Sequence, residues 1–260
     1  SFEIESNQSH SSTPRLIHQM WKTSNLLTYP INNSHLQWKK SYPDYKIILW
    51  TDEQIEEIIL RKDYIYLYPV YKSYLYGIQR ADLARLIVLH SQGGVYVDLD
   101  VFPSDRNIEA LRSRDASLLI ARSSSDICLI NHFLVAEKNS SLIDYILHQV
   151  HRKSFFQQIY ILPYLEVFST GSIFLTNVLR KRMKFADKIN DRLVILSSTH
   201  LSQFVNHDAG RSWHLLDGYL INQIDAHPKI FLSFLIIVLG FCLIKFASRF
   251  RTSFGPRLAK

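Results

Sequence analysis

Cysteine is scarce in this 260-residue chain, which has only Cys128 and Cys242. The second lies inside an apolar run, so a disulfide framework does not hold the fold together. Cysteine usage therefore indicates nothing about the compartment. The chain also lacks a Walker loop, a Ser/His/Asp triad signature and zinc-type Cys/His spacing. It contains no internal repeat and no low-complexity run.

Acidic residues are also in deficit, because 23 Asp and Glu stand against 30 Lys and Arg and give a formal charge of +7. An excess of this size is compatible with nucleic-acid binding. Much of it, however, is concentrated in residues 245–260, so we interpret it as a basic tail and expect no nucleic-acid partner. Hydrophobic residues make up 47% of the chain, which is ample for a core.

A long apolar run precedes that tail. Residues 230–244, extendable through 247, have no polar face and approach the lower limit of about 17 residues for a membrane-spanning helix. The alternative is a buried C-terminal helix, which the basic cluster directly after the run disfavours. We therefore expect a transmembrane helix over residues 229–247 and a basic cytoplasmic tail over 248–260.

The rest of the chain then lies on the lumenal side of a single-pass protein, because positive residues flanking a span stay cytoplasmic. A short span suits a thin internal membrane, so we expect the Golgi or ER–Golgi membrane. Three glycosylation sequons, which begin at Asn7, Asn32 and Asn139, agree with a lumenal domain. The chain begins at Ser1 without Met, which leaves a missing N-terminal signal or anchor open.

Strands and helices alternate between residues 14 and 228, after a flexible lead-in over 1–13. We expect strands at 14–21, 45–50, 95–98, 117–121, within 127–135, and at 193–196. We expect helices at 34–42, after the cap Thr51-Asp52-Glu53-Gln54, and at 71–91, 140–152 and 169–183. This alternation predicts one α/β domain with a mainly parallel sheet.

The most informative motif is Asp98-Leu99-Asp100, which follows the apolar run Val95-Tyr96-Val97. Strand alternation sends residues i and i+2 to one face, so we expect the two carboxylates to lie together. Two close carboxylates repel unless a cation or a proton lies between them. A hard divalent ion with positions left for phosphate oxygens meets this need, which favours Mn²⁺ or Mg²⁺. Open α/β sheets bind ligands at this end of their strands.

The helix before the motif carries Arg80, Asp82 and Arg85. Asp82 and Arg85 are three residues apart and share one helix face, so an anion-binding arginine adjoins the acidic pair. Together they indicate a nucleotide-diphosphate ligand. The alternative is a surface salt-bridge ladder, in which each pair contributes only about 0.2–0.5 kcal/mol.

Aromatic and polar side chains supply further candidates. Trp21 and Trp50 end their strands at the same edge as Asp98, and they are either core residues or a platform for a nucleobase. Residues 206–214 are dense in polar groups, and His207 or His214 is a candidate third metal ligand. The neighbouring Ser212 and Trp213 are candidates for donating hydrogen bonds to a departing phosphate.

One competing interpretation of the function uses the same Asp-Leu-Asp triplet. Phosphatases with an aspartyl nucleophile begin with Asp-x-Asp-x-Val after an apolar strand, but they also need a later lysine and a further acidic pair. The available pair, Asp187 and Asp191, has no nearby glycine, which disfavours this interpretation.

The chain resembles the glycosyltransferases whose sugar-binding region carries an Asp-x-Asp motif. The resemblance rests on residues 14–23 (PRLIHQMWKT), 43–52 (PDYKIILWTD), 78–100 and 210–214. Within that group it is most similar to the fungal-type mannosyltransferases that act on inositol phosphoceramide. This closer likeness rests on Ile161-Leu-Pro-Tyr164, Phe168-Ser-Thr-Gly171, Ser212-Trp213-His214 and the C-terminal apolar run.

The resemblance implies a GT-A fold and a retaining, metal-dependent transfer of mannose from GDP-mannose to a membrane glycosphingolipid. It implies that Asp98 and Asp100 hold Mn²⁺ against the diphosphate, and that Asp82 contacts sugar or ribose hydroxyls. The nucleotide-sugar-binding residues implied are His18, Trp21, Trp50, Arg80, Asp82, Arg85, Asp98, Ser212 and Trp213. The catalytic set implied is Asp82, Arg85 and Asp100.

Several alternatives stay open. The donor is GDP-mannose or another nucleotide-sugar such as UDP-galactose, and the acceptor is a lipid or a glycan. A catalytically silent lectin-like protein is a further alternative, which the intact Asp98/Asp100 pair disfavours. His132 stands where the resemblance implies an acidic residue after Asn131, and the resemblance leaves room for a regulatory subunit.

Overall fold

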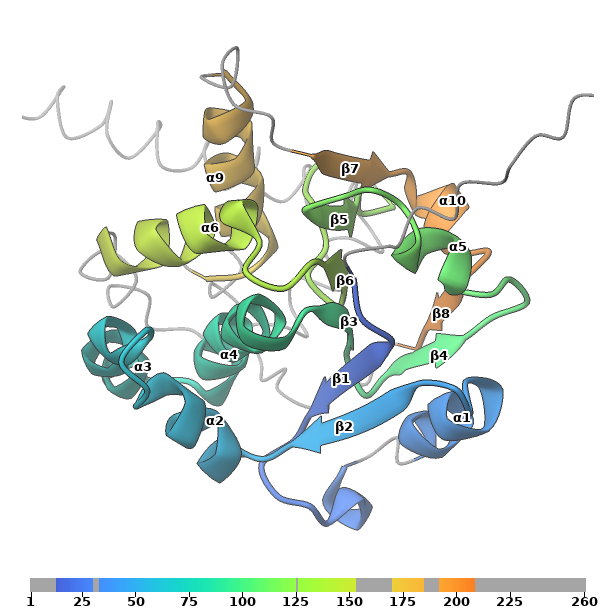
Figure 1. Cartoon of the computed structure of the whole chain (residues 1–260), viewed down its shortest axis with the longest axis horizontal. Helices are drawn as coiled ribbons and strands as arrows, with labels where there is room; N and C mark the ends of the chain where they lie inside the picture. The colour runs from blue at the N-terminus through green and yellow to red at the C-terminus, as the bar shows by residue number, and fades with distance from the viewer. Residues whose placement is uncertain (1–12, 30–32, 125, 153–169, 185–191, 209–260) are drawn as a thin grey trace, which may run out of the picture. The chain divides into compact units, whose positions relative to one another are not determined.

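The computed structural model describes residues 13–29, 33–124, 126–152, 170–184 and 192–208 (Figure 1). The chain divides into two units, Ser1–Trp213 and His214–Lys260, and all described residues belong to the first. The predicted lead-in (apart from Thr13), span and tail lie outside the described residues, as do Ser212, Trp213 and His214. Within those ranges, no helix has the length and apolarity needed to cross a bilayer.

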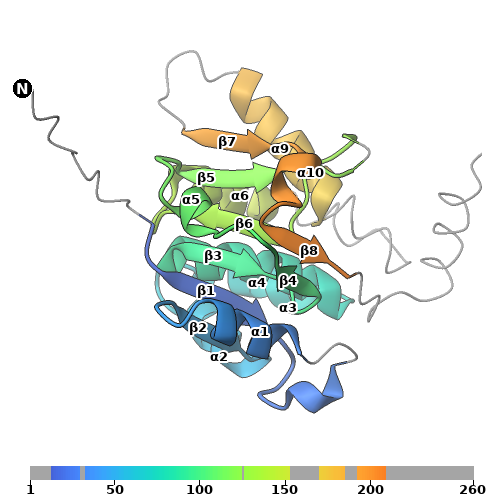
Figure 2. The ribbon, with the colours of Figure 1, turned by 90° about the vertical axis from the view of Figure 1, so that its right-hand side faces the viewer.

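A six-stranded sheet forms the centre of the described unit, in the order β2-β1-β3-β6-β5-β7 (Figure 2). The strands are β1 (Leu16–Met20), β2 (Lys46–Trp50), β3 (Gly94–Val97), β5 (Leu118–Ala121), β6 (Phe133–Ala136) and β7 (Leu193–Leu196). Strand β6 is antiparallel to both of its neighbours, and every other neighbouring pair is parallel. The expected mainly parallel α/β sheet is therefore confirmed.

Helices cover both faces of the sheet (Figure 2). One core contains apolar side chains of α2 (Asp52–Ile59), α3 (Tyr68–Ser73), α4 (Gly77–Gln92), α6 (Ser141–Arg152) and α9 (Ser172–Lys184). The opposite core contains those of α1 (Ser34–Ser41), α5 (Glu109–Arg112) and α10 (Ser198–Leu201). Short 3-10 turns, η1 (Leu26–Thr28) and η2 (Ile65–Leu67), complete the described helices.

Local sequence signals explain where two of these helices begin. The predicted cap of α2 is present, because Thr51 Oγ1 accepts from the Gln54 backbone and Gln54 Oε1 accepts from the Thr51 backbone. The helix expected at 71–91 is two helices, since α3 ends at Ser73 and α4 begins at Gly77. A cap on Tyr76 separates them, with its backbone N–H donating to Gln79.

Two glycines turn the chain from α4 into β3. Gly93 has a φ of 68° and Gly94 a φ of 110°. Residues that carry a side chain rarely adopt such positive φ angles. A Cβ at Gly93 would lie 2.7 Å from the Lys138 backbone nitrogen, and one at Gly94 would lie 2.7 Å from the Leu16 carbonyl oxygen. The close packing of helix, strand and loop therefore requires glycine at both positions.

A second, two-stranded sheet joins β4 (Val101–Pro103) to β8 (Val205–His207) in antiparallel fashion. Val101 lies opposite His207, and the Asp208 backbone N–H donates to the Asp100 carbonyl oxygen at 2.9 Å. The sequence did not predict this pairing. It brings a segment from about a hundred residues downstream to the Asp-Leu-Asp motif.

Candidate active site at the carboxyl edge of the sheet

Asp98 and Asp100 lie in a tight turn directly after β3. The turn is closed by the Val101 N–H, which donates to the Asp98 carbonyl oxygen at 3.1 Å. Strand alternation was therefore the wrong reason for expecting the carboxylates together, because the strand ends at Val97. Ser34 and Trp38 of α1 hold the end of the turn, since both donate to the Val101 carbonyl oxygen, at 2.6 and 2.8 Å.

The Asp98 carboxylate is held from several sides. Tyr96 donates its hydroxyl to Oδ1 at 2.6 Å, and the Arg85 guanidinium lies 3.6 Å from Oδ2. The Asp98 backbone N–H donates to the His132 carbonyl oxygen at 3.0 Å. Burial raises the pKa of Asp98 above its usual value, Arg85 opposes that shift, and the negative charge of Asp100 adds to it. The acidic pair therefore repels, as the sequence predicts.

Behind Asp98 lies a buried polar network centred on Asp82. This side chain is 2% exposed and accepts from Asn131 at 2.7 Å and from Thr170 at 2.8 Å. Arg85, 3% exposed, pairs with Asp82 at 3.2 Å and donates to the Asn131 carbonyl oxygen at 2.7 Å. These groups are fully engaged with one another, so the network holds Arg85 against Asp98.

The buried network affects the prediction that Asp82 and Arg85 contact the nucleotide-sugar donor. Both carboxylate oxygens of Asp82 already accept from protein groups, and both side chains are almost completely buried. They act on Asp98 as positioning groups in this arrangement, and direct contact with sugar or phosphate stays a prediction. The surface salt-bridge ladder is excluded, because the Asp82–Arg85 pair is buried.

His207 approaches the acidic pair from β8. Its Nε2 lies 3.6 Å from Asp100 Oδ2, and its ring stacks on His132 with the centroids 4.1 Å apart. Burial lowers the pKa of His207, but the hydrogen bond and charge of Asp100 together with the charges of Asp98 and Asp208 outweigh it, so the net shift is upward. Burial, together with the neighbouring His207, lowers the pKa of His132 to about 3. His132 is therefore neutral at physiological pH.

The chemistry of this cluster fits a hard divalent ion that is shared with a diphosphate. Asp98 and Asp100 would supply oxygen ligands, and His207, one of the two predicted nitrogen ligands, lies beside them. No group of three His, Cys, Asp or Glu side chains among the described residues is arranged to hold a metal. Ions such as Mg²⁺ are often bound by one or two carboxylates together with substrate phosphates. His214 lies outside the described residues.

His18 has a structural position. It is 0% exposed, its Nε2 donates to the Gly93 carbonyl oxygen at 2.8 Å, and its Nδ1 accepts from the Trp50 indole at 3.0 Å. Burial lowers its pKa to about 4, so the ring is neutral. Both ring nitrogens are occupied by protein groups, so the described geometry offers neither to a nucleotide. His18 instead joins β1, β2 and the Gly93 turn.

The two tryptophans lie at one edge, as predicted, and both are half-buried. The Trp21 backbone N–H donates to the Trp50 carbonyl oxygen at 3.0 Å, which brings the two chain positions together. The Trp21 indole donates to Thr28 at 2.6 Å, and its ring meets Tyr29 edge-on, with the centroids 4.6 Å apart. Stacking of a base on Trp21 remains a prediction.

Arg80 lies apart from the Asp98 cluster. It lines a polar cavity of about 300 Å³ together with Asp52, Glu53, Glu56, Tyr71 and Lys72. Its guanidinium donates to the Tyr74 carbonyl oxygen at 2.9 Å. The predicted nucleotide-sugar contact of Arg80 therefore requires a ligand that extends into this polar cavity.

Sequence reasoning missed several residues of the network. Tyr96 was treated only as part of an apolar strand, and Asn131 and Thr170 entered only through the resemblance. Their signal is tertiary, because Asn131 and Thr170 lie 49 and 88 residues from the Asp82 that they bond.

Comparison with known proteins shows the family of this chain. The glycosyltransferase sugar-binding region containing a DXD motif matches residues 28–118, which include Asp82, Arg85, Asp98 and Asp100. Inositol phosphoceramide mannosyltransferase 3 of Schizosaccharomyces pombe is 32% identical over 251 residues, which cover 91% of this chain and 67% of that protein. This chain belongs to the DXD glycosyltransferase family.

Other family members extend the comparison. Inositol phosphoceramide mannosyltransferase 1 of Schizosaccharomyces pombe is 30% identical over 88% of this chain and 72% of that protein. Mannosyl phosphorylinositol ceramide synthase SUR1 of Saccharomyces cerevisiae is 28% identical over 82% of this chain. The matched region covers only 55% of the length of SUR1. Among solved structures, the PaToxG glycosyltransferase has a TM-score of 0.50 at 16% identity, over 67% of this chain and 72% of that one. That likeness concerns the fold.

Proposed function

We propose that this glycosyltransferase is a GT-A enzyme that transfers mannose from GDP-mannose to inositol phosphoceramide, with retention of configuration. The observation that carries the proposal is the Asp98–Asp100 turn with Arg85 behind it, in a chain about 30% identical to inositol phosphoceramide mannosyltransferases over most of its length. The names of the relatives support mannose and inositol phosphoceramide, and the GDP leaving group rests on the resemblance described above.

The chemistry follows from the charge that develops during transfer. Breaking the sugar–phosphate bond builds negative charge on the diphosphate, and a bound Mn²⁺ or Mg²⁺ would stabilise it at Asp98 and Asp100. Tyr96 and Arg85 contact the Asp98 carboxylate, at 2.6 and 3.6 Å, and so fix its orientation in the turn that also carries Asp100. No carboxylate nucleophile emerges from the sequence, so we favour front-face attack assisted by the leaving phosphate.

The proposal includes a cellular arrangement. The catalytic domain lies in the Golgi lumen, the segment 229–247 spans the membrane once, and the basic tail 248–260 is cytoplasmic. This arrangement rests on the sequence, through the short apolar run, the basic cluster after it and the three sequons. It places the catalytic domain beside a membrane lipid acceptor and leaves room for a regulatory subunit.

The direct test is transfer by the full chain, purified in detergent, with inositol phosphoceramide and radiolabelled GDP-mannose as substrates. We expect a mannosylated lipid with Mn²⁺ present and none after chelation. Parallel reactions with UDP-galactose and with a glycan acceptor test the alternatives. If no nucleotide-sugar is bound or split with metal present, the enzyme interpretation is wrong and the lectin-like alternative takes its place.

A further inference from the structure

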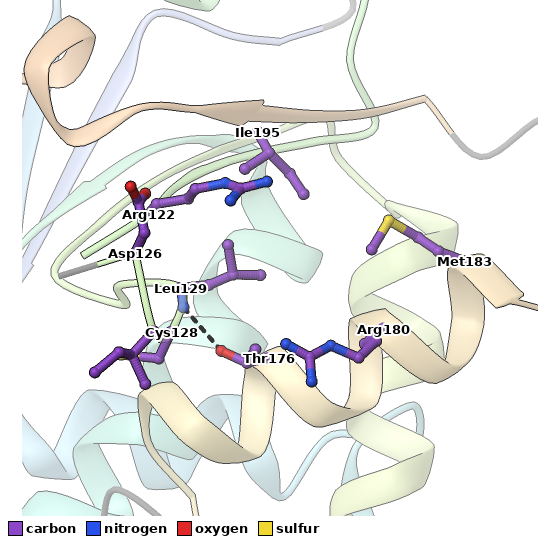
Figure 3. Close-up of a pocket in the computed structure, with 9 residues that line it drawn as sticks. Arg122, Asp126, Cys128, Leu129, Thr176, Arg180, Met183 and Ile195 are labelled. Carbon is purple, nitrogen blue, oxygen red and sulfur yellow. Dashed lines mark hydrogen bonds between the residues drawn. The ribbon is translucent and has the colours of Figure 1, made fainter. Parts of the chain in front are cut away.

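A second cavity, of about 120 Å³, lies between the end of β5, the loop that follows it, helix α9 and β7. Arg122 enters it from the end of β5 and Arg180 from α9 (Figure 3). Its remaining lining is Asp126, Ile127, Cys128, Leu129, Thr176, Met183 and Ile195. None of the roles assigned above involves this cavity.

The charge of this cavity favours an anion. Arg122 and Arg180 contribute two positive charges and Asp126 one negative charge, which leaves a net formal charge of +1. Within the described ranges, neither guanidinium has a carboxylate partner at ion-pair distance, whereas other arginines such as Arg112 and Arg192 do. Paired guanidinium groups bind phosphate with strong, charge-assisted hydrogen bonds.

The rim of the same cavity is apolar and exposed. Ile127 is 73% exposed and Met183 is 47% exposed, and both are among the large hydrophobic side chains that contact water most. Asp126, between Ile127 and the end of β5, has a φ of 56°, which turns the loop sharply. A cationic centre with an apolar rim matches an amphiphile that joins a phosphate to a hydrocarbon chain.

The cavity lies on the same edge of the sheet as Asp98. Strands β3 and β5 are both antiparallel to β6, which lies between them, so their carboxyl ends share one edge. Asp98 follows β3 and Arg122 follows β5, so their backbones lie two strand spacings apart, roughly 10 Å. The loop between β5 and β6 continues from Leu129, which lines the cavity, to Asn131, which bonds Asp82.

Helix α9 makes a second link between the cavity and the active site. It begins beside Thr170, which donates to Asp82, and its Thr176 accepts from the Leu129 backbone N–H at 2.8 Å. Arg180 lies eight residues after Ser172, or about 12 Å along the helix axis. The β5–β6 loop and α9 therefore connect the cavity to the residues that bond Asp82.

We infer that Arg122 and Arg180 bind the phosphate of the lipid acceptor, with Ile127 and Met183 beside the start of its hydrocarbon chain. This inference rests on the proposed function and identifies where its acceptor binds. A phosphodiester held here places an attached polyol ring between the arginines and Asp98, which is where the sugar must be received. Free phosphate shares the anionic chemistry but lacks the polyol and the chain.

The test measures binding to the full chain in detergent micelles by calorimetry, with three probes. These are octyl phosphoinositol, the octyl ether of inositol without phosphate, and inorganic phosphate. We expect Arg122→Gln and Arg180→Gln each to weaken octyl phosphoinositol binding about tenfold, the usual scale of one charge-assisted hydrogen bond. The ether should bind weakly, and neither arginine substitution should change its affinity. Inorganic phosphate should bind more weakly than octyl phosphoinositol.

Two control variants separate the site from general charge effects. Arg61→Gln removes an exposed arginine elsewhere and should leave binding unchanged. Asp126→Asn removes the negative charge of the cavity and should leave binding unchanged or tighten it. Equal binding of the ether and the phosphodiester, or wild-type binding by both arginine variants, overturns the inference.

Hydrolysis of GDP-mannose without acceptor separates this inference from the proposed function. We expect both arginine variants to hydrolyse the donor at the wild-type rate, and a loss of that activity would assign the arginines to the donor and overturn the acceptor site. If the wild-type chain binds octyl phosphoinositol through these arginines but splits no GDP-mannose, the proposed donor is wrong and the phosphate site stands. Donor hydrolysis without phosphoinositol binding refutes the site and leaves the enzyme.

Discussion

The substitution Asp82→Asn tests whether Asp82 holds the active site together or contacts the donor. Asp82 is 2% exposed, its two oxygens accept from Asn131 and Thr170, and it forms an ion pair with Arg85. Asparagine has the same shape but keeps only one accepting oxygen. Its amide NH₂ must therefore face at least one of these three donors, and Arg85 loses its nearest negative charge.

The expected cost follows from those contacts. Breaking a buried ion pair costs about 3–5 kcal/mol. In the variant, the Asp98 carboxylate still lies 3.6 Å from Arg85 and compensates part of the arginine's positive charge. We therefore expect the free energy of unfolding to fall by about 3 kcal/mol, at the lower end of that range. For a chain of this size, that corresponds to a fall in the melting temperature of roughly 6–12 °C.

The assay is thermal unfolding of the full chain in detergent, followed by circular dichroism, beside GDP-mannose hydrolysis. Asp105→Asn is the matched control, because Asp105 is exposed, and we expect it to change stability by less than about 0.5 kcal/mol. Wild-type stability in Asp82→Asn with a raised KM for the donor would refute the positioning role. That result would instead support the predicted contact with sugar or ribose hydroxyls.

Three further predictions concern the turn, the glycines and a surface ion pair. Asp100→Ala should abolish mannosyl transfer while the circular dichroism spectrum stays unchanged, and normal turnover would contradict the metal assignment. Gly94→Ala should lower stability by at least about 2 kcal/mol in urea unfolding, because its Cβ would lie 2.7 Å from the Leu16 carbonyl oxygen at a φ of 110°. Hydrogen bonds from Arg112 lower the pKa of Glu109 from 4.5 to about 2, so its contribution is complete above pH 4.5 and is lost as the pH falls towards 2. Because Glu109 is 32% exposed, Glu109→Gln should cost about 1–2 kcal/mol at pH 7 and flatten the pH dependence of urea unfolding between pH 5 and 2.

Local patterns were sufficient to predict most of the sheet and its helices. Strand β7 was predicted with the bounds that the structure gives, Leu193–Leu196, because it is a short apolar run between polar segments. The capping box at Thr51 was also predictable, because its two hydrogen bonds join residues only three positions apart. In each case the determining interactions are close in sequence.

The small sheet and the buried network depend on distant contacts. Strand β4 has three residues and includes Pro103, so no periodicity reveals it. Its partner β8 lies about a hundred residues away, and its pairing places His207 beside Asp100. The sequence named His207 as a candidate from its chemistry alone, and no local pattern could choose between it and His214.

The Asp-Leu-Asp turn illustrates how a right expectation can rest on a wrong cause. Strand alternation would fix both carboxylates by the pleat, whereas the turn leaves their orientation to neighbouring groups. Tyr96 and Arg85 hold Asp98, while Ser34 and Trp38 hold the carbonyl oxygen of Val101 at the end of the turn. Since these groups come from three different elements, the spacing of the acidic pair is a property of the folded domain. The motif therefore identifies the chemistry, and the packing of α1, α4 and β3 around it determines whether that chemistry is available.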